Sequence, residues 1–226
     1  MRHAHCFNIG LPSGAAAVVG NGMEADGTEE MELDEVDAAR AALYRLLAHV
    51  LGRSPTPDLL ARMAALNGDD TPLGSALRGT AAAAGASPGA WAAEYDVLFI
   101  GVARGELLPY ASFYLTGFLH ERPLARLRAD LGPLGLARAD DRSDPEDHIA
   151  MICEVMATLI ERQDEAEAIF FARHLAPWGV AFFTDLERAK AAGLFRSIGQ
   201  LGRLLVALDR QGFAYAADPI PVQGAA

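Results

Sequence analysis

Glu146, Asp147 and His148 are adjacent and form the densest group of titratable side chains outside the N-terminal region. An imidazole beside a carboxylate could act as a general base, which would suit a small-molecule hydrolase centred on Asp147 and His148. Acidic residues are also favoured in the first turn of a helix, where they stabilise the positive end of its dipole. Because Asp144-Pro145 stands directly before the group, a helix start is the simpler interpretation.

The other combinations of chemically reactive residues are weak. His3, His5 and Cys6 are metal-ligand types, but three donors near a chain end rarely make a site without a fourth ligand and a fixed scaffold. Residues 74–80 have the glycine spacing of a phosphate-binding loop and lack its lysine. No Gly-x-Ser-x-Gly nucleophile motif occurs. We therefore expect no catalytic residue, no metal site and no bound cofactor.

Charge and cysteine content restrict the class of protein further. The 19 basic residues against 30 acidic ones give a net charge of −11, which argues against nucleic acid as a partner. Eight of the acidic residues lie between Glu24 and Asp37, where no basic residue occurs. Two cysteines, Cys6 and Cys153, cannot build a disulfide framework, as expected for a reducing compartment. No segment has the length and composition of a membrane span or an export signal, so we expect a cytoplasmic protein without stable membrane insertion.

A repeated pair of residues predicts where helices begin. Ser or Thr precedes Pro at 56–57, 71–72 and 87–88, and Asp144-Pro145 repeats the pattern with a carboxylate. The side-chain oxygen can cap the free amides of the first turn, and proline at the first helical position needs no hydrogen-bond acceptor. Four such pairs predict four helices, the fourth with Asp144 as its N-cap and Asp147 in its first turn.

The hydrophobic pattern is helical almost throughout. A helix is predicted from about residue 36 to Gly52, and further helices at about 165–175, 178–192 and 194–211. No run alternates apolar and polar residues as a half-buried strand would. The predicted fold class is all-α, a single globular bundle of eight to ten helices. The residues expected to face inward are Val36, Leu43, Leu46, Leu47, Val50 and Leu51 in the first helix, Ile149, Ile152, Cys153, Met156, Leu159 and Ile160 along one face of the helix after Asp144, and Leu194, Ile198, Leu201, Leu204, Leu205 and Leu208 in the last.

The chain divides into three parts on composition. Residues 1–34 are expected to be a disordered acidic leader, because they contain too few apolar side chains to bury. Residues 35–215 are expected to form the helical domain, and residues 216–226 a frayed tail. Within the domain, the Gly- and Pro-containing segments 101–109 and 132–143 are the least regular, and such segments often carry binding sites.

Four short motifs follow one another in the middle of the chain: EYDVLF at 94–99, PYASFYL at 109–115, PEDH at 145–148 and HLAPW at 174–178. In order and spacing they resemble the TorD/DmsD family of cytoplasmic chaperones for molybdenum-containing redox enzymes, to which NarJ proteins are more distantly related. The resemblance covers residues 38–212. The acidic leader has no counterpart in the family, and Tyr110 stands where some members have tryptophan.

The resemblance implies an all-helical chaperone that binds the twin-arginine signal peptide of an apo-enzyme, delays its export and favours insertion of the molybdopterin cofactor. The client would be of the formate dehydrogenase or sulfoxide/amine-oxide reductase type, and relatives include monomers and domain-swapped dimers. The positions that match the peptide-binding residues of the family are Tyr95, Leu98, Phe99, Pro109, Asp147 and His148.

The chemistry of such a peptide suits these residues. A carboxylate binds a guanidinium group through two parallel hydrogen bonds, which Glu146 and Asp147 could accept. A groove lined by aromatic side chains, including Tyr110, would suit the hydrophobic stretch that follows the arginines. We expect Leu98 to be in the core and Tyr95 to face the groove. Two other hypotheses are the hydrolase and a non-catalytic helical adaptor.

Overall fold

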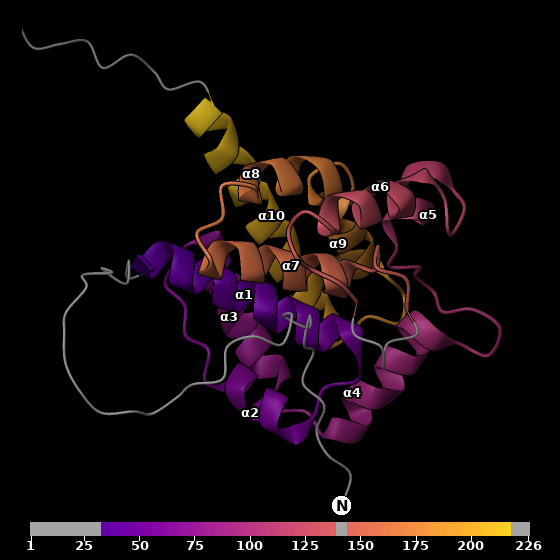
Figure 1. Cartoon of the computed structure of the whole chain (residues 1–226). Helices are drawn as coiled ribbons and strands as arrows, with labels where there is room; N and C mark the ends of the chain where they lie inside the picture. Colours follow the sequence, from indigo (N-terminus) through magenta and orange to yellow (C-terminus); the bar gives the residue numbers. More distant parts are fainter. Residues whose placement is uncertain (1–32, 139–143, 218–226) are drawn as a thin grey trace, which may run out of the picture.

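The computed structural model describes residues 33–138 and 144–217, which form helices joined by loops (Figure 1). The described residues contain ten α-helices, two π-helical segments and no β-strand, which confirms the all-α prediction. The predicted leader up to residue 32, with His3, His5 and Cys6, and the predicted tail from residue 218 lie outside the described residues. The elements are α1 (Glu35–Gly52), α2 (Pro57–Ala64), α3 (Pro72–Ala83), α4 (Pro88–Tyr95), η1 (Asp96–Ile100), α5 (Ala111–Thr116), α6 (Arg122–Leu131), α7 (Ile149–Glu161), α8 (Glu167–Phe170), η2 (Phe171–Leu175), α9 (Gly179–Arg188) and α10 (Phe195–Ala217), where η marks a π-helix.

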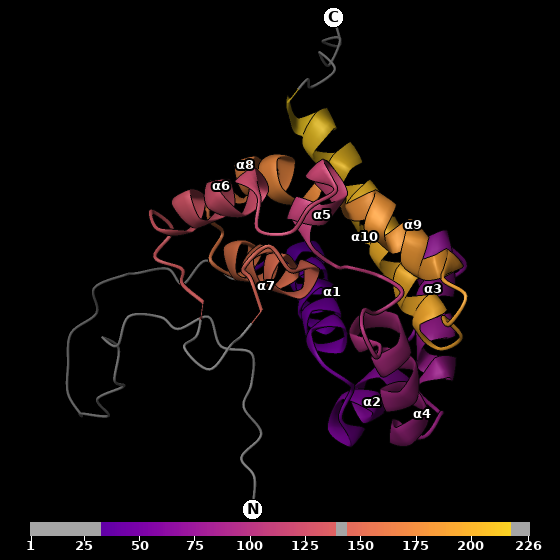
Figure 2. The same ribbon diagram turned by 90° about the vertical axis from the view of Figure 1, so that its right-hand side faces the viewer.

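Helix α7 lies against α1 in the middle of the molecule, between α5, α6 and α8 on one side and α2 and α4 on the other (Figure 1, Figure 2). Eleven of its thirteen residues are buried, including Glu154, which pairs with Arg45 of α1. The six residues predicted to face inward are all buried, but the buried surface extends well beyond the one predicted face, because neighbouring elements also cover the other sides of the helix. A helix that is apolar nearly all round is typical of a central position.

Three of the four predicted helix starts are confirmed. The hydroxyl groups of Thr56, Thr71 and Ser87 each accept a hydrogen bond from the backbone amide three residues later, and proline occupies the next position. The fourth start, at Asp144, is wrong: α7 begins at Ile149, and His148 is its N-cap. The contacts that prevent an earlier start belong to the candidate site and are described below.

Two residues that the periodicity placed in the core are exposed. Val36 and Leu208 have exposed fractions of 68% and 47%. In α10 the buried residue at this level is instead Asp209, which accepts hydrogen bonds from the Tyr44 hydroxyl at 2.7 Å and from Arg40. A charged residue that is buried with its partners cannot be recognised from hydrophobic periodicity. Helix α10 continues to Ala217, two residues into the predicted tail, whereas α9 ends at Arg188.

No helix among the described residues is both long enough and apolar enough to cross a lipid bilayer.

Candidate functional site

Two motifs that are distant in the sequence cross in the structure. The Ala111 amide donates to the Asp147 carbonyl at 2.9 Å, and the Ile149 amide donates to the Pro109 carbonyl at 2.8 Å. These bonds form one isolated antiparallel bridge between Tyr110 and His148. The crossing therefore brings together four of the predicted site residues: Pro109, Tyr110, Asp147 and His148.

Asp147 is held at the crossing by the backbone of α5. Its side chain is only 1% exposed, and Oδ2 accepts a hydrogen bond from the Ser112 amide at 2.8 Å. Ser112 is the second residue of α5, and Tyr110, the N-cap of that helix, makes no side-chain cap. Asp147 thus caps α5, not α7. Its two bonds to residues 111 and 112 hold the segment before Ile149 out of a helical conformation, which explains why α7 does not begin at Asp144.

His148 is also committed to a structural bond. Its Nδ1 accepts a hydrogen bond from the Ala150 amide at 3.1 Å, and its ring packs edge-to-face on Tyr110 with the centroids 5.1 Å apart. Because Nδ1 accepts there, it cannot at the same time donate to an orienting carboxylate, as a general base would require. The hydrolase hypothesis loses the arrangement on which it depended.

A cleft of about 550 Å³ opens beside the crossing. The predicted site residues Phe99, Tyr110 and Asp147 all line it. Arg104 and His120, which the sequence analysis did not single out, also border it. The apolar and aromatic side chains of the lining come from η1, from the loop after it and from the segments around the crossing: Phe99, Ile100, Ala103, Leu108, Tyr110, Leu119 and Pro145.

Exposed apolar side chains are concentrated on the two segments that border the cleft. Apolar side chains that stay in contact with water beside a cleft are typical of surfaces that receive another chain. Sequence reasoning missed this surface because the spacing of apolar residues does not distinguish an exposed apolar face from a buried one; the signal was an uncharged apolar stretch interrupted by Gly117. The exposed residues are Val97, Ile100 and Val102 from η1 and the loop after it, and Leu115, Phe118 and Leu119 from α5 and the turn after it.

The loop after η1 folds back on η1 and fixes one wall of the cleft. The Leu107 amide donates to the Leu98 carbonyl at 2.9 Å. A Cβ atom at Gly105 would lie 2.5–2.7 Å from backbone atoms of Leu98 and Phe99, so only glycine fits there. The loop begins at Gly101, whose φ of +62° also favours glycine. The segment 101–109, predicted to be irregular, thus contributes Ala103, Arg104, Gly105 and Leu108 to the lining of the cleft.

Tyr95 and Leu98 belong to the core and not to the cleft. Leu98 is fully buried, as expected. Tyr95 was expected to face the groove, but it is buried, and its hydroxyl donates to the Leu51 carbonyl at 3.4 Å. Its ring packs on those of Phe99 and Phe195. From the sequence alone, the helical spacing of aromatic residues does not tell which of them a distant helix covers. Here α10 covers Tyr95.

Glu146 points toward α6 and is not part of the cleft lining, although Pro145 and Asp147 on either side of it are. Its carboxylate accepts a hydrogen bond from Arg128 Nε at 2.9 Å, and Arg138 Nε lies 3.8 Å from its other oxygen. Partial burial acts to raise the pKa of Glu146. The hydrogen bond from Arg128 and the two positive charges outweigh that effect, so the pKa is below its ordinary value.

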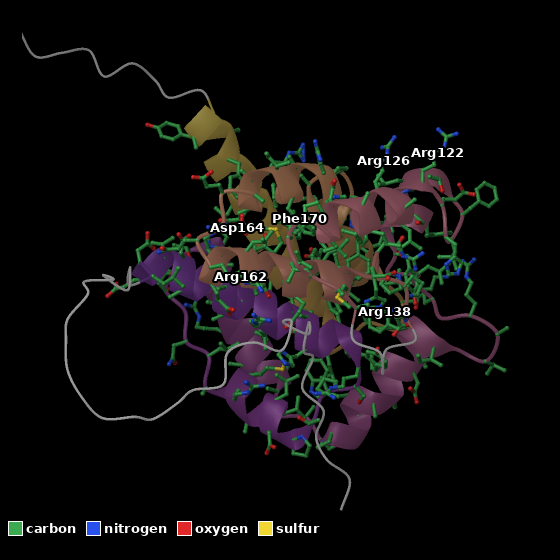
Figure 3. The ribbon with its side chains drawn as sticks, in the orientation of Figure 1. Arg122, Arg126, Arg138, Arg162, Asp164 and Phe170 are labelled. Carbon is green, nitrogen blue, oxygen red and sulfur yellow. The ribbon has the colours of Figure 1, made fainter. Side chains whose placement is uncertain are left out.

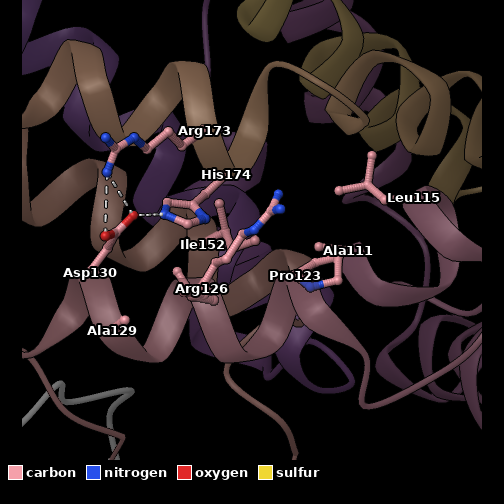
Figure 4. Close-up of a pocket in the computed structure, with 10 residues that line it drawn as sticks. Ala111, Leu115, Pro123, Arg126, Ala129, Asp130, Ile152, Arg173 and His174 are labelled. Atoms are coloured by element: carbon pink, nitrogen blue, oxygen red, sulfur yellow. Dashed lines mark hydrogen bonds and ion pairs between the residues drawn. The ribbon is translucent and has the colours of Figure 1, made fainter.

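A second cavity, of about 440 Å³, lies between α6 and η2 (Figure 4). Asp130 of α6 contacts His174 Nε2 at 2.8 Å and Arg173 Nη1 at 3.3 Å. The hydrogen bond with His174 and the charge of Arg173 lower the pKa of Asp130. Burial lowers the pKa of His174 by more than Asp130 raises it, so the pKa of this imidazole lies below its ordinary value.

Among the described residues, no group of three or more His, Cys, Asp or Glu side chains is arranged to hold a metal ion. Cys153 is buried in the core, and burial raises the pKa of its thiol.

Comparison with known proteins places these features in a family. The family model described as "Nitrate reductase delta subunit" matches residues 66–184, which include both cavities and the crossing. The chaperone protein TorD of Vibrio cholerae is 30% identical over 132 residues, which are 53% of this chain and 60% of that protein. TorD of Vibrio vulnificus is 36% identical over 78 residues, 34% of this chain and 36% of that protein. The chain thus matches less than two thirds of the length of these relatives.

A solved structure has the same fold. The crystal structure of a putative redox enzyme maturation protein from Archaeoglobus fulgidus superposes with a TM-score of 0.52. The superposition covers 83% of this chain and 99% of the other, at 18% sequence identity. The match to the family model covers more than half of the chain and includes all four motifs in full. The protein therefore belongs to the nitrate reductase delta subunit family, which includes the NarJ and TorD chaperones.

Proposed function

We propose that the protein is a molecular chaperone that binds the twin-arginine signal peptide and the apo form of a molybdopterin-containing redox enzyme. It would hold this client in the cytoplasm until the cofactor is inserted, before export. Family membership supports the proposal, since the Vibrio relatives are named chaperones and the Archaeoglobus protein is titled a redox enzyme maturation protein. The client type that we propose is a formate dehydrogenase or a sulfoxide or amine-oxide reductase.

One observation carries the proposal: an apolar, aromatic-lined cleft lies directly beside two consecutive carboxylates. Asp147 lines the cleft, and Glu146 lies just outside it. Successive side chains of an extended peptide point in opposite directions. Of two consecutive arginines crossing this edge, one could therefore direct its guanidinium group to Glu146, while the other enters the cleft, where the charge of the buried Asp147 attracts it.

The hydrophobic stretch that follows the arginines would cover the apolar surface beside the cleft. Phe99 and Tyr110 line the cleft, and Ile100, Phe118 and Leu119 expose apolar side chains at its border. Burying such surface against a peptide contributes about 25 cal/mol per Å². The backbone of the site is fixed by the crossing and by the loop at Gly105, which lowers the ordering cost of binding.

The structural bonds of His148 and Asp147 support a binding role over catalysis. Both side chains are occupied by backbone amides of α7 and α5. A residue that holds two segments together shapes a surface for a ligand without taking part in proton transfer. No specific contact favours the adaptor hypothesis, which requires no cleft.

Calorimetric titration tests the proposal with peptides that carry an Arg-Arg pair followed by an apolar stretch. We expect the Arg-Arg peptide to bind at least tenfold more tightly than its Lys-Lys counterpart, because lysine cannot make the bidentate bond. Replacing the apolar stretch with serine and glycine should abolish binding. Equal affinity for all three peptides would overturn the proposal.

A pair of variants locates the peptide. Phe118 and Tyr215 are both exposed aromatic residues, the first beside the cleft and the second at the end of α10. Phe118→Ala should weaken binding of the Arg-Arg peptide about three- to tenfold, the effect of losing a modest interface contact. Tyr215→Ala should leave it unchanged, and neither variant should shift the thermal midpoint. Equal effects of the two substitutions would place the peptide elsewhere.

A further inference from the structure

The Glu146 carboxylate is already occupied by arginine. Both Nε and Nη2 of Arg128 lie within 2.9 Å of Glu146 Oε2. Arg138, from the loop after α6, faces the other oxygen, Oε1, at 3.8 Å. In the free protein, two guanidinium groups of the chain itself thus surround the carboxylate that lies beside the cleft.

These contacts have the same chemistry that a twin-arginine peptide offers. A guanidinium group from the peptide can form a bidentate pair with Glu146 only if the contact with Arg128 is given up, because the pair needs both carboxylate oxygens and Arg128 uses the lone pairs of Oε2. The exchange is inexpensive. The Arg128 side chain is 55% exposed and that of Glu146 is 13% exposed, so water can solvate the displaced Arg128 guanidinium group while the peptide's guanidinium group replaces it at the carboxylate.

We infer that Arg128 is an internal competitor for the peptide: it occupies Glu146 in the free protein and is displaced when an arginine of the signal peptide binds. The inference rests on the proposed function. Arg128 then sets how tightly a peptide must bind Glu146 in order to displace it. It lowers the apparent affinity of every cationic peptide by the same factor, so that weak ligands such as Lys-Lys peptides stay unbound at concentrations where Arg-Arg peptides bind.

Removing the competitor should therefore tighten binding. For Arg128→Gln we expect about two- to fivefold tighter binding of the Arg-Arg peptide, and the same factor for the Lys-Lys peptide wherever its binding is measurable. Arg138→Gln should have a smaller effect in the same direction, because its contact with Glu146 is longer.

A simpler explanation of such a gain would be reduced repulsion between a basic protein surface and a basic peptide. Arg126 is the matched control for this effect. It lies on the same helix two residues earlier, it is exposed, and it makes no ion pair with any residue in the described part of the chain. Its side chain lies at the surface of α6 (Figure 3) and borders the second cavity, not the cleft (Figure 4). General repulsion predicts the same gain for Arg126→Gln as for Arg128→Gln, whereas competition predicts a gain only for the latter.

The decisive experiment is a double-mutant cycle, measured by calorimetric titration of the full-length protein with the Arg-Arg peptide. It compares the wild type with Arg128→Gln, Glu146→Gln and the double variant, with Arg126→Gln as control. If Arg128 competes for Glu146, Arg128→Gln tightens binding in the wild type but has no effect in the Glu146→Gln background. A gain that persists in that background, an equal gain for Arg126→Gln, or no gain at all would each overturn the inference.

The same titration separates the two proposals. If the wild type does not bind the Arg-Arg peptide, the proposed function fails. If the wild type binds it and prefers it over the Lys-Lys peptide, but Arg128→Gln leaves the affinity unchanged, only the inference about Arg128 fails.

Discussion

The two cavities of this protein are built on similar elements and hold their charges differently. Each is bordered by a π-helical segment, the cleft by η1 and the second cavity by η2. In the cleft, Asp147 binds a backbone amide, and the surrounding apolar side chains stay partly exposed. In the second cavity, Asp130 binds His174 and Arg173, so the charged groups satisfy one another.

This difference separates a surface that can receive a ligand from one that joins two helices. An apolar cleft with exposed borders gains free energy when another chain covers it. In the second cavity, the acidic and basic side chains already pair across α6 and η2. These contacts stabilise the packing of α6 against η2 and leave little to be gained by binding another chain. A π-helical segment, which is often found at functional sites, is therefore not sufficient by itself to identify the binding site.

The largest effect that we predict is a loss of stability when a buried side chain behind the wall of the cleft is truncated. Leu98→Ala removes a fully buried side chain of η1 and should lower the free energy of unfolding by about 2–5 kcal/mol. Ile100→Ala, in the same segment but with an exposed side chain, should change it by less than about 1 kcal/mol. Urea denaturation measures both. Equal losses would mean that the cleft wall is packed throughout and does not offer a free surface.

Asp147→Ala should have the next largest effect, because it leaves the buried Ser112 amide without a partner. We expect a loss of about 1–3 kcal/mol in the free energy of unfolding. Asp147→Asn should lose less than half of that, since an amide oxygen can still accept the hydrogen bond. The same urea titrations decide the outcome. An unchanged Asp147→Ala variant would show that the carboxylate does not cap α5.

Asp130→Ala should be milder than Asp147→Ala, although it breaks two contacts. Asp130 is about one third exposed, so water can replace its partners, and we expect a loss below about 1 kcal/mol. A loss larger than that of Asp147→Ala would reverse our comparison of the two cavities, because the paired charges would then be the more important structural contact.

The smallest effect is a titration shift. We expect the pKa of His174 to lie below 6.5, and Asp130→Asn to lower it further, because the carboxylate charge partly offsets the effect of burial. NMR spectroscopy of the imidazole protons measures both values. Because the folded-state pKa is below the unfolded one, the unfolded state takes up the proton first, and stability falls as the pH decreases from about 6.5. A pKa that rises in Asp130→Asn would contradict the assignment.

Local chemistry made part of the structure predictable. Thr56, Thr71 and Ser87 cap their helices because capping needs only a side-chain oxygen and the free amides of the first turn, and the proline at the next position favours a helix start there, all within one turn of sequence. The family resemblance pointed to Phe99 and Asp147, and the argument for an aromatic groove added Tyr110; all three line the cleft. The resemblance did so through the order of motifs, without indicating how the segments meet.

The errors arose where a contact joins distant residues. Asp147 was assigned to the helix that follows it, because nothing in the local sequence reveals that Ser112 lies within hydrogen-bond distance. Tyr95 was expected in the groove because its cover, Phe195 of α10, is about a hundred residues away. The two π-helical segments were invisible, since a single wider turn barely alters the spacing of apolar residues.

The burial of α7 has a consequence for how the cleft moves. One wall of the cleft, the segment before Ile149, is attached directly to α7, which is almost entirely buried. The backbone amides of this segment should therefore exchange with solvent only when the whole domain unfolds. The other wall is the loop after η1, which begins at Gly101 and exposes Val102 fully to water. Its amides should exchange through local opening. The cleft would therefore adapt to peptides of different bulk from one side only, while the carboxylates of residues 146 and 147 keep their place.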